Sequence, residues 1–225
     1  MSWVKNCFLK ERTSRAGRVA YLASSTRIES AKFSRPHNTG VVTLGDFRGR
    51  WIVLFSHPAD FTPVCTSEFI AFANAQDDFD ALDCQLLGLS VDSLPSHLAW
   101  LDAIRRELGV TIRFPVIEDP SMAIARAYGM LDQSAENSST VRSSFIIDPA
   151  GNIQSILVYP LSVGRSVKEI LRTVKALKHS AESSMLTPES WEPGKPLFEP
   201  SSCTFDKVSM QDSALWFYRL KEDRK

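Results

Sequence analysis

Residues 51–69 read Trp51-Ile-Val-Leu-Phe-Ser-His-Pro-Ala-Asp-Phe-Thr-Pro-Val-Cys-Thr-Ser-Glu-Phe69, and this stretch decides the fold. Its first five residues form a continuous apolar run, which predicts a buried strand. A loop that holds Pro58 and Pro63 follows, and a helical pattern then runs from Thr66 to about Phe79. A cysteine, Cys65, therefore stands where the loop after a buried strand meets a helix.

Short apolar runs and helical patterns continue to alternate through the middle of the chain. We expect strands at 84–91, 115–117, 144–147 and 153–159, and helices at 94–108, 121–128 and 167 to about 179. The last two strands flank the turn 148–151 and form an antiparallel hairpin. A hairpin added to strands that helices connect makes a mixed sheet with helices on both faces. The α/β order thus predicts a thioredoxin-like fold.

The two ends of the chain differ from this regular middle part. Four prolines lie between Thr187 and Pro200, which excludes a helix there and suits an extended arm. The arm runs on to the aromatic residues 216–218, and we expect it to lie against the body or a partner subunit. We therefore divide the chain into a basic N-terminal extension (1–30), a thioredoxin-like domain (31–183) and a C-terminal arm for dimerisation (184–225).

The charge of the chain is balanced overall but uneven at its start. With 26 basic and 26 acidic side chains, the composition gives no support to binding nucleic acid or a membrane surface. Residues 1–35 nevertheless carry eight Lys or Arg against only Glu11 and Glu29. Such a head is compatible with an organellar transit peptide and equally with a disordered extension. We expect a cytoplasmic protein without a membrane span, with organellar import as the alternative.

The four cysteines, Cys7, Cys65, Cys84 and Cys203, lie far apart in the sequence. They show neither the paired spacing of a zinc site nor a redox C-x-x-C pair, so we expect no metal and no cofactor. In a reducing compartment they are expected to be free thiols. Cys84 opens a buried strand pattern and is expected in the core.

Cys65 has the surroundings of a reactive thiol. A cysteine in the first turn of a helix lies at the positive end of the helix dipole, near unpaired backbone N–H groups that favour thiolate over thiol. A redox pair would need a second cysteine three residues earlier, but Thr62 stands there, and its hydroxyl can only donate or accept hydrogen bonds. Pro58 and Pro63 stiffen the loop that leads to the cysteine.

Pro58, Thr62 and Cys65 together match P-x-x-x-T-x-x-C, within the run Ser-His-Pro-Ala-Asp-Phe-Thr-Pro-Val-Cys-Thr at 56–66. This block closely resembles the peroxiredoxin signature of the AhpC/TSA superfamily, in the form typical of the one-cysteine subfamily. The resemblance continues through segments 88–93, 97–100, 129–132, 141–149, 159–160 and 164–165. At Glu29–Phe33 the chain departs from the Pro-Asp-Phe with which the family enters its N-terminal hairpin.

The resemblance implies a thiol peroxidase that reduces hydrogen peroxide and alkyl hydroperoxides in antioxidant defence. Cys65 would attack the peroxide and become a sulfenic acid, while Arg142 and Thr62 stabilise the charge on the leaving oxygen. An external thiol such as thioredoxin or glutathione would then restore Cys65. Kinship also implies a homodimer or a ring of dimers.

Three further residues are secondary candidates, each with a second interpretation. Arg165 corresponds to a second arginine common in the subfamily, but without the resemblance it would be a solvated surface charge. His57 either orients the pocket or contacts the peroxide, or is a satisfied loop histidine. Glu68 is either the carboxylate that the subfamily tends to keep or a first-turn acid favoured by the helix dipole.

Two alternative functions stay open at the level of sequence. Cys203 could act as a resolving cysteine, although Ala214 and Arg219 stand where relatives with such cysteines carry them beside the terminal aromatic residues. The other alternative is a redox-inert chaperone or scaffold on the same fold, which the joint presence of Thr62, Cys65 and Arg142 opposes.

Overall fold

The computed structural model of the chain describes residues 31–35, 38–131, 140–201, 215 and 217–223. Its centre is a seven-stranded sheet in the order β2-β1-β5-β4-β3-β6-β7. The strands are β1 (Ala31–Arg35), β2 (Asn38–Val42), β3 (Trp51–Ser56), β4 (Cys84–Ser90), β5 (Val116–Glu118), β6 (Arg142–Ile147) and β7 (Ile153–Tyr159). Strands β3, β4 and β5 are parallel and all other pairs are antiparallel, so the predicted mixed sheet is confirmed.

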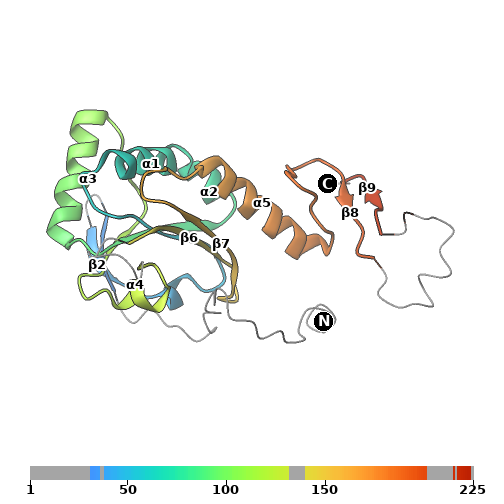
Figure 1. Cartoon of the computed structure of the whole chain (residues 1–225), viewed down its shortest axis with the longest axis horizontal. Coiled ribbons are helices and arrows are strands. Elements are labelled where there is room, and N and C mark those ends of the chain that lie inside the picture. The colour runs from blue at the N-terminus through green and yellow to red at the C-terminus, as the bar shows by residue number, and fades with distance from the viewer. Residues whose placement is uncertain (1–30, 36–37, 132–139, 202–214, 216, 224–225) are drawn as a thin grey trace.

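Helices cover both faces of this sheet (Figure 1). They are the 3-10 turn η2 (Leu44–Phe47), α1 (Pro63–Asn74), α2 (Gln76–Ala81), α3 (Leu94–Leu108), α4 (Ala123–Ala127) and α5 (Val167–Ser183). In Figure 1, α1, α2 and α5 lie on one side of the sheet and α4 on the other. The α/β fold expected from the sequence, a thioredoxin-like sheet flanked by helices, is therefore the observed one.

The central strand β3 is buried on both faces because each face meets its own core. Val53 and Phe55 point into the core under α1, α3 and α5, whereas Ile52 and Leu54 point into the core that η2 and α4 close. Successive side chains of a strand point to opposite faces, so a strand between two cores must be apolar throughout. This is the reason for the continuous apolar run at 51–55.

One expected helix differs from the sequence-based expectation in two ways. The helix expected from Thr66 to about Phe79 begins earlier, at Pro63, because proline is favoured at the first helical position. It is also interrupted at Ala75, whose φ of −92° and ψ of 2° separate α1 from α2. The helix expected at 94–108 has the predicted bounds, and Gly109 ends it with a φ of 67°.

The two ends of the described chain carry small antiparallel pairs. At the N-terminal side β1 pairs with β2, and this hairpin extends the sheet beyond β5. In the C-terminal arm β8 (Leu197–Phe198) pairs with β9 (Leu220–Lys221). Trp191 and Leu197 of the arm form a small buried cluster with Ala176 of α5. The arm thus lies at the end of α5, away from the sheet (Figure 1).

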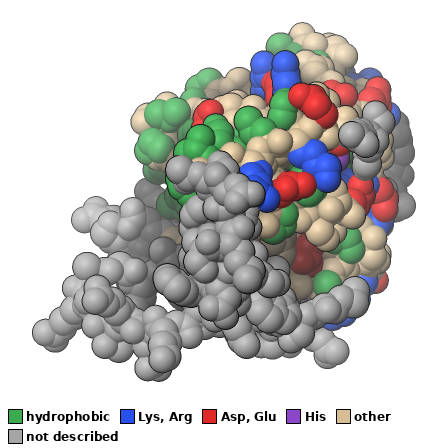
Figure 2. Space-filling model, turned by 90° about the vertical axis from the view of Figure 1, so that its right-hand side faces the viewer, with side chains coloured by type: hydrophobic (Ala, Val, Ile, Leu, Met, Phe, Trp, Pro, Cys, Tyr) green, Lys and Arg blue, Asp and Glu red, His purple; other side chains and the backbone are tan. Residues whose placement is uncertain are grey.

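One face of the molecule shows how its charged side chains are distributed. On the face drawn in Figure 2, the described basic and acidic side chains lie next to one another rather than in separate patches. Among the described residues, no helix is both long enough and apolar enough to cross a membrane.

Candidate active site

Cys65 lies in the first turn of α1, two residues after its start at Pro63. Thr62 caps this end of the helix in an extended conformation, and its carbonyl accepts the first intrahelical bond from the N–H of Thr66 at 2.9 Å. The neighbouring backbone N–H groups at a helix start lack intrahelical partners and favour negative charge. Cys65 therefore lies where the sequence placed it, at the positive end of a helix.

Arg142 is the side chain that meets the sulfur. Its Nη1 lies 3.3 Å from Cys65 Sγ, and its Nε donates to the carbonyl of Leu161 at 2.9 Å. The contact follows from the topology, because β6 runs antiparallel to β3 and pairs Ser144 with Phe55. Residue 142 therefore arrives beside the end of β3, where the loop to Cys65 begins.

Glu68 joins Arg142 to Arg165 at the base of the site. Its Oε2 accepts from Arg142 Nη1 and from Arg165 Nη2, both at 2.8 Å. Its Oε1 accepts from the backbone N–H of Arg165 at 2.7 Å and from Arg165 Nε at 3.0 Å. Glu68 is 2% exposed, so these bonds replace its hydration almost completely.

The charges of this cluster favour an anion at the sulfur. Burial raises the pKa of Glu68, but the hydrogen bonds and positive charge of Arg165, with Arg142, outweigh it and hold that pKa below its ordinary value. One carboxylate therefore faces two guanidinium groups, since arginine stays protonated. The cluster therefore keeps one net positive charge, and Arg142, one of its two guanidinium groups, is in contact with Cys65.

Arg165 is also held by groups other than Glu68. Its Nη1 donates to the carbonyl of Ser143 at 2.9 Å, and its guanidinium lies 5.2 Å from the ring centre of Phe55. This side chain is buried rather than solvated at the surface. It therefore fixes the carboxylate that in turn orients Arg142.

The loop between β3 and α1 presents the remaining expected residues. Pro58 is partly buried, and the Thr62 hydroxyl donates to the carbonyl of Ala59 at 2.9 Å. With its proton used in this way, the Thr62 oxygen keeps lone pairs that can accept from a hydroperoxide.

His57 belongs to a buried cluster that the sequence reasoning did not identify. Its Nε2 lies 2.9 Å from Asp60 Oδ1, and the other Asp60 oxygen lies 2.8 Å from His97 Nδ1. Asp60 had no distinguishing pattern beyond its place in the loop, and His97 comes from α3. Only the packing of α3 beside the loop brings the second histidine to the carboxylate.

The cysteines differ sharply in their surroundings. Cys65 has no exposed surface, so a peroxide reaches the sulfur only when neighbouring side chains move aside. Cys84 is equally buried at the start of β4, and burial raises the pKa of its thiol to about 12. Cys203 lies outside the described residues, so its expected role as a possible resolving thiol is not addressed by the structure.

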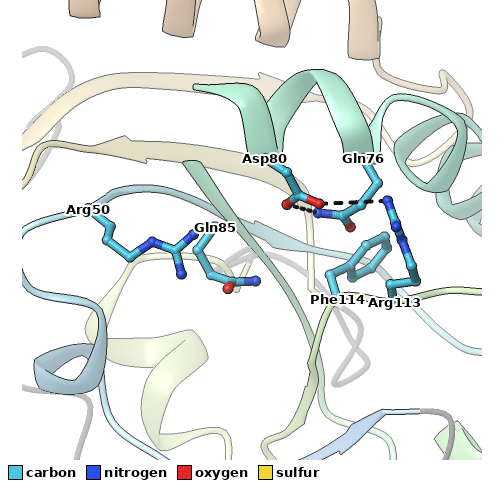
Figure 3. A pocket seen from close by; sticks show the side chains of 6 residues that line it. All are labelled: Arg50, Gln76, Asp80, Gln85, Arg113 and Phe114. Atoms are coloured by element: carbon cyan, nitrogen blue, oxygen red, sulfur yellow. Dashed lines mark hydrogen bonds and ion pairs between the residues drawn. The ribbon is translucent and has the colours of Figure 1, made fainter. Parts of the chain in front are cut away.

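A hollow of about 280 Å³ lies at the opposite ends of the strands (Figure 3). It is lined by Arg50, Gln76, Asp80, Gln85, Arg113 and Phe114. Arg50 precedes β3 and Gln85 is the second residue of β4, whereas Cys65 follows the carboxyl end of β3. The hollow therefore does not belong to the cysteine site.

Comparison with known proteins places the chain in a family. The model of the AhpC/TSA family matches residues 29–156. A Caldanaerobacter subterraneus protein named peroxiredoxin 2 is 47% identical over 76% of this chain and 78% of its own length. A Methanosarcina mazei peroxiredoxin is 41% identical over 84% of this chain and 95% of its own length.

Solved structures give the same assignment. A reduced 2-Cys peroxiredoxin of Plasmodium vivax superposes with a TM-score of 0.71 at 35% identity, covering 77% of this chain and 90% of that one. A yeast mitochondrial 1-Cys peroxiredoxin gives a TM-score of 0.73 at 33% identity, covering 87% and 96%. A cysteine at a helix start, an arginine on its sulfur and these likenesses lead to one conclusion: the chain belongs to the AhpC/TSA family and is a peroxiredoxin, a thiol peroxidase.

Proposed function

We propose that this peroxiredoxin uses a one-cysteine mechanism, in which Cys65 reduces hydrogen peroxide and alkyl hydroperoxides and an external thiol restores it. The observation that carries the proposal is the 3.3 Å contact between Arg142 Nη1 and Cys65 Sγ. The same nitrogen is held by Glu68 at 2.8 Å, so the donor stands ready before any substrate arrives.

In the first step the Cys65 thiolate attacks the terminal oxygen of the hydroperoxide R–O–O–H. An S–O bond forms while the O–O bond breaks, which oxidises the sulfur to a sulfenic acid and reduces the leaving oxygen to RO⁻. RO⁻ then takes up a proton and leaves as an alcohol, or as water when R is hydrogen. Arg142 stabilises the charge that moves onto this oxygen, whereas Thr62, whose own proton is donated to the Ala59 carbonyl, accepts from the O–H of the bound hydroperoxide.

In the second half of the cycle a thiol outside the chain attacks the sulfenic acid. It forms a mixed disulfide with Cys65 and releases water, and a second thiol then displaces Cys65 as a free thiol. The yeast 1-Cys relative supports this assignment, because its thiol-resolving mechanism runs through glutathione and thioredoxin systems. Hydroperoxide and a small or protein thiol are therefore the proposed partners.

Stopped-flow oxidation of the reduced enzyme by hydrogen peroxide and by cumene hydroperoxide tests the proposal. Cys65→Ser should abolish the consumption of both peroxides, because serine has no nucleophilic thiolate. Cys84→Ser is the matched control and should retain at least half of the rate, since Cys84 lies in the core at the start of β4. A Cys65→Ser variant that still turns over peroxide would overturn the assignment.

A two-cysteine mechanism with Cys203 is the main competitor. Under the one-cysteine proposal, Cys203→Ser keeps multiple turnovers with glutathione or thioredoxin. Mass spectrometry after one equivalent of peroxide separates the two mechanisms, since a Cys65 to Cys203 disulfide would establish Cys203 as the resolving thiol. A redox-inert scaffold would leave Cys65 unoxidised in the same experiment.

We also propose that the chain works as a homodimer, with residues 31–183 as the peroxidase domain and residues 184–225 as a dimerisation arm. The outer strand β7 supports this proposal: among the described residues it pairs with β6 alone, and its exposed face carries Ile156 and Val158, which are 41% and 61% exposed. Sedimentation of the wild type and of Val158→Lys tests the dimer, which the lysine should weaken.

A reducing compartment such as the cytoplasm suits an enzyme that must return Cys65 to the thiol.

A further inference from the structure

The buried cluster of His57, Asp60 and His97 stands beside the peroxidase site without a role in the steps above. His57 and His97 have no exposed surface, and Asp60 is 7% exposed. The carboxylate lies between the two rings, 2.9 Å from Nε2 of His57 and 2.8 Å from Nδ1 of His97. Three polar side chains buried together in this way need a physical reason, because each loses its hydration.

The distances identify hydrogen bonds rather than a metal site. Two ligands at tetrahedral positions about 2.0 Å from a zinc ion lie about 3.3 Å apart. Here each nitrogen is closer than that to its own carboxylate oxygen, at 2.9 and 2.8 Å. Asp60 therefore bridges two N–H groups, one with each oxygen.

This bridge fixes where the proton of His57 lies. The hydrogen bonds of the two histidines overcome the effect of burial and hold the pKa of Asp60 below its ordinary value, so Asp60 is a carboxylate that only accepts. Nε2 of His57 must then carry the hydrogen. Burial also lowers the pKa of His57, against the opposing charges of Asp60 and Asp92, with His97 adding to the lowering. The ring is thus neutral, and its Nδ1 is a bare acceptor.

That acceptor has no partner within the described part of the chain, although it is completely buried. The ring that carries it packs on Phe69 of α1, one helical turn after Cys65, with 4.8 Å between ring centres. The backbone N–H of Asp60 donates to Asp92 at 2.9 Å, which ties the loop to the start of α3. The same loop carries Pro58 and Thr62, so the cluster positions the residues that surround the thiol.

We propose that Asp60 and His97 are positioning residues of the peroxidase: through the two hydrogen bonds of the Asp60 carboxylate they hold His57 as the tautomer whose bare Nδ1 accepts from the O–H of a hydroperoxide. The proposal rests on the proposed function of Cys65. His97, which lies on α3 and outside the signature motif, becomes a determinant of the rate of Cys65 oxidation.

Two substitutions of His97 separate hydrogen bonding from packing. In His97→Asn the side-chain nitrogen is as many bonds from Cα as imidazole Nδ1, so it can still donate to Asp60. His97→Leu keeps apolar volume but offers no donor. We expect His97→Leu to slow the oxidation of Cys65 by hydrogen peroxide by about tenfold, and His97→Asn to stay within about threefold of the wild type.

His179→Leu is the matched control, because His179 is also a mostly buried histidine near an aspartate, with 3.6 Å to Asp223, but packs on Trp191 of the arm. Its rate should equal that of the wild type. Asp60→Asn should slow the reaction at least as much as His97→Leu, because the amide NH2 that replaces one carboxylate oxygen only donates and leaves one ring without its acceptor. A His97→Leu enzyme at the full rate, or a His97→Asn enzyme as slow as His97→Leu, would overturn the proposal.

Long-range proton–nitrogen NMR of the resting wild-type enzyme tests the same proposal without any variant or turnover. The expected spectrum of His57 has a protonated Nε2 and a bare Nδ1. A doubly protonated ring, or a proton on Nδ1, contradicts the inference even if Cys65 is fully active. Conversely, an inert Cys65 in an enzyme with the expected His57 tautomer would refute the proposed function and leave the hydrogen-bonded cluster in place.

Discussion

At the scale of single residues, Arg142 supplies donors in three directions at once. Nη1 serves both Cys65 and Glu68, and Nε holds the carbonyl of Leu161. A lysine ammonium is a single point charge on a flexible stem and cannot reproduce this fork. The function of residue 142 should therefore depend on the shape of its guanidinium group and not only on its positive charge.

Arg142→Lys should consequently slow the oxidation of Cys65 by about 100-fold, the usual cost of one lost donor at a developing charge. Stopped-flow fluorescence with hydrogen peroxide measures the rate constant. Arg172→Lys is the control, because Arg172 pairs with Glu169 at the surface of α5 and should leave the rate unchanged. A lysine variant within twofold of the wild type would mean that charge alone suffices.

The Cys84 thiol offers a second test at this scale. Its pKa is raised to about 12 by burial, so at pH 8 almost no thiolate is present and no surface is open to a reagent. Iodoacetamide should therefore leave Cys84 unmodified in the folded enzyme and label it only in denaturant, as peptide mass spectrometry reads directly. Rapid labelling of native Cys84 would contradict the buried position at the start of β4.

Which residues the sequence could identify depends on whether their partners are local. Pro58, Thr62 and Cys65 lie within one loop and one helical turn, so a spaced motif captures them. Asp60 and His97 meet across 37 positions in the chain. No periodicity or spacing encodes that contact, which exists only because α3 packs beside the loop.

At the scale of elements, α1 packs closely on the sheet at a glycine of β4, Gly88. A Cβ added to Gly88 would lie 3.2 Å from the Phe69 ring and 3.5 Å from the Phe55 ring. Both rings are completely buried, so neither can swing into open space. The close approach of helix and strand therefore depends on the missing side chain.

Gly88→Ala should lower the free energy of unfolding by about 1–3 kcal/mol through overpacking. Urea denaturation followed by circular dichroism measures the change. Gly45→Ala serves as control, because the nearest atom to its added Cβ is the hydroxyl of Thr43 on an exposed turn. Equal free energies of unfolding for the two variants would show that the aromatic cluster accommodates the added methyl group without loss of stability.

The helix break at Ala75 illustrates why element boundaries escape a sequence argument. Alanine is the best helix former, and nothing around it marks an end. The break instead lets α2 pack on β4, with Phe79 in the core below. Tertiary packing thus overrides the local preference, whereas the end of α3 at Gly109 was predictable because glycine tolerates the positive φ.

At the scale of the whole molecule, buried titratable groups set the response to acid. Asp60 and Glu68 have pKa values below their ordinary range in the folded chain, and that of His57 is also lowered. In each case the unfolded chain binds a proton at a pH where the folded chain does not. Stability must therefore fall as the pH falls, first below about 6.5 through His57 and then below about 4 through the carboxylates.

The urea concentration at which half of the wild-type protein is unfolded should decrease steadily as the pH is lowered from 7 to 3. The steepest decrease should occur below about pH 4. In Glu68→Gln one carboxylate no longer titrates, so the loss in the acidic range should be smaller even though the variant starts from a lower stability. A wild-type midpoint that stays constant down to pH 3 would contradict the assignment of ionised, buried carboxylates.

The global architecture was largely predictable because apolar runs such as 51–55 and the turn at 148–151 report strand burial and pairing locally. The N-terminal hairpin of β1 and β2 was not, since the segment at Glu29–Phe33 departs from the family pattern. Besides β2, the antiparallel partner of β1 in the sheet is β5, more than 80 positions later in the chain. Such a pairing is set by the assembled sheet and not by either segment alone.

The contacts of the site also have a consequence for the order of events during folding. Arg142 meets Cys65 across 77 positions and Arg165 meets Glu68 across 97. Loops of that length close late, because chain entropy opposes them until the sheet exists. A refolding chain should therefore regain helix content before Cys65 becomes reactive. A nascent chain that ends before Arg165 should be inactive as a peroxidase. Peroxide reactivity therefore shows that the chain has been made and folded as far as Arg165.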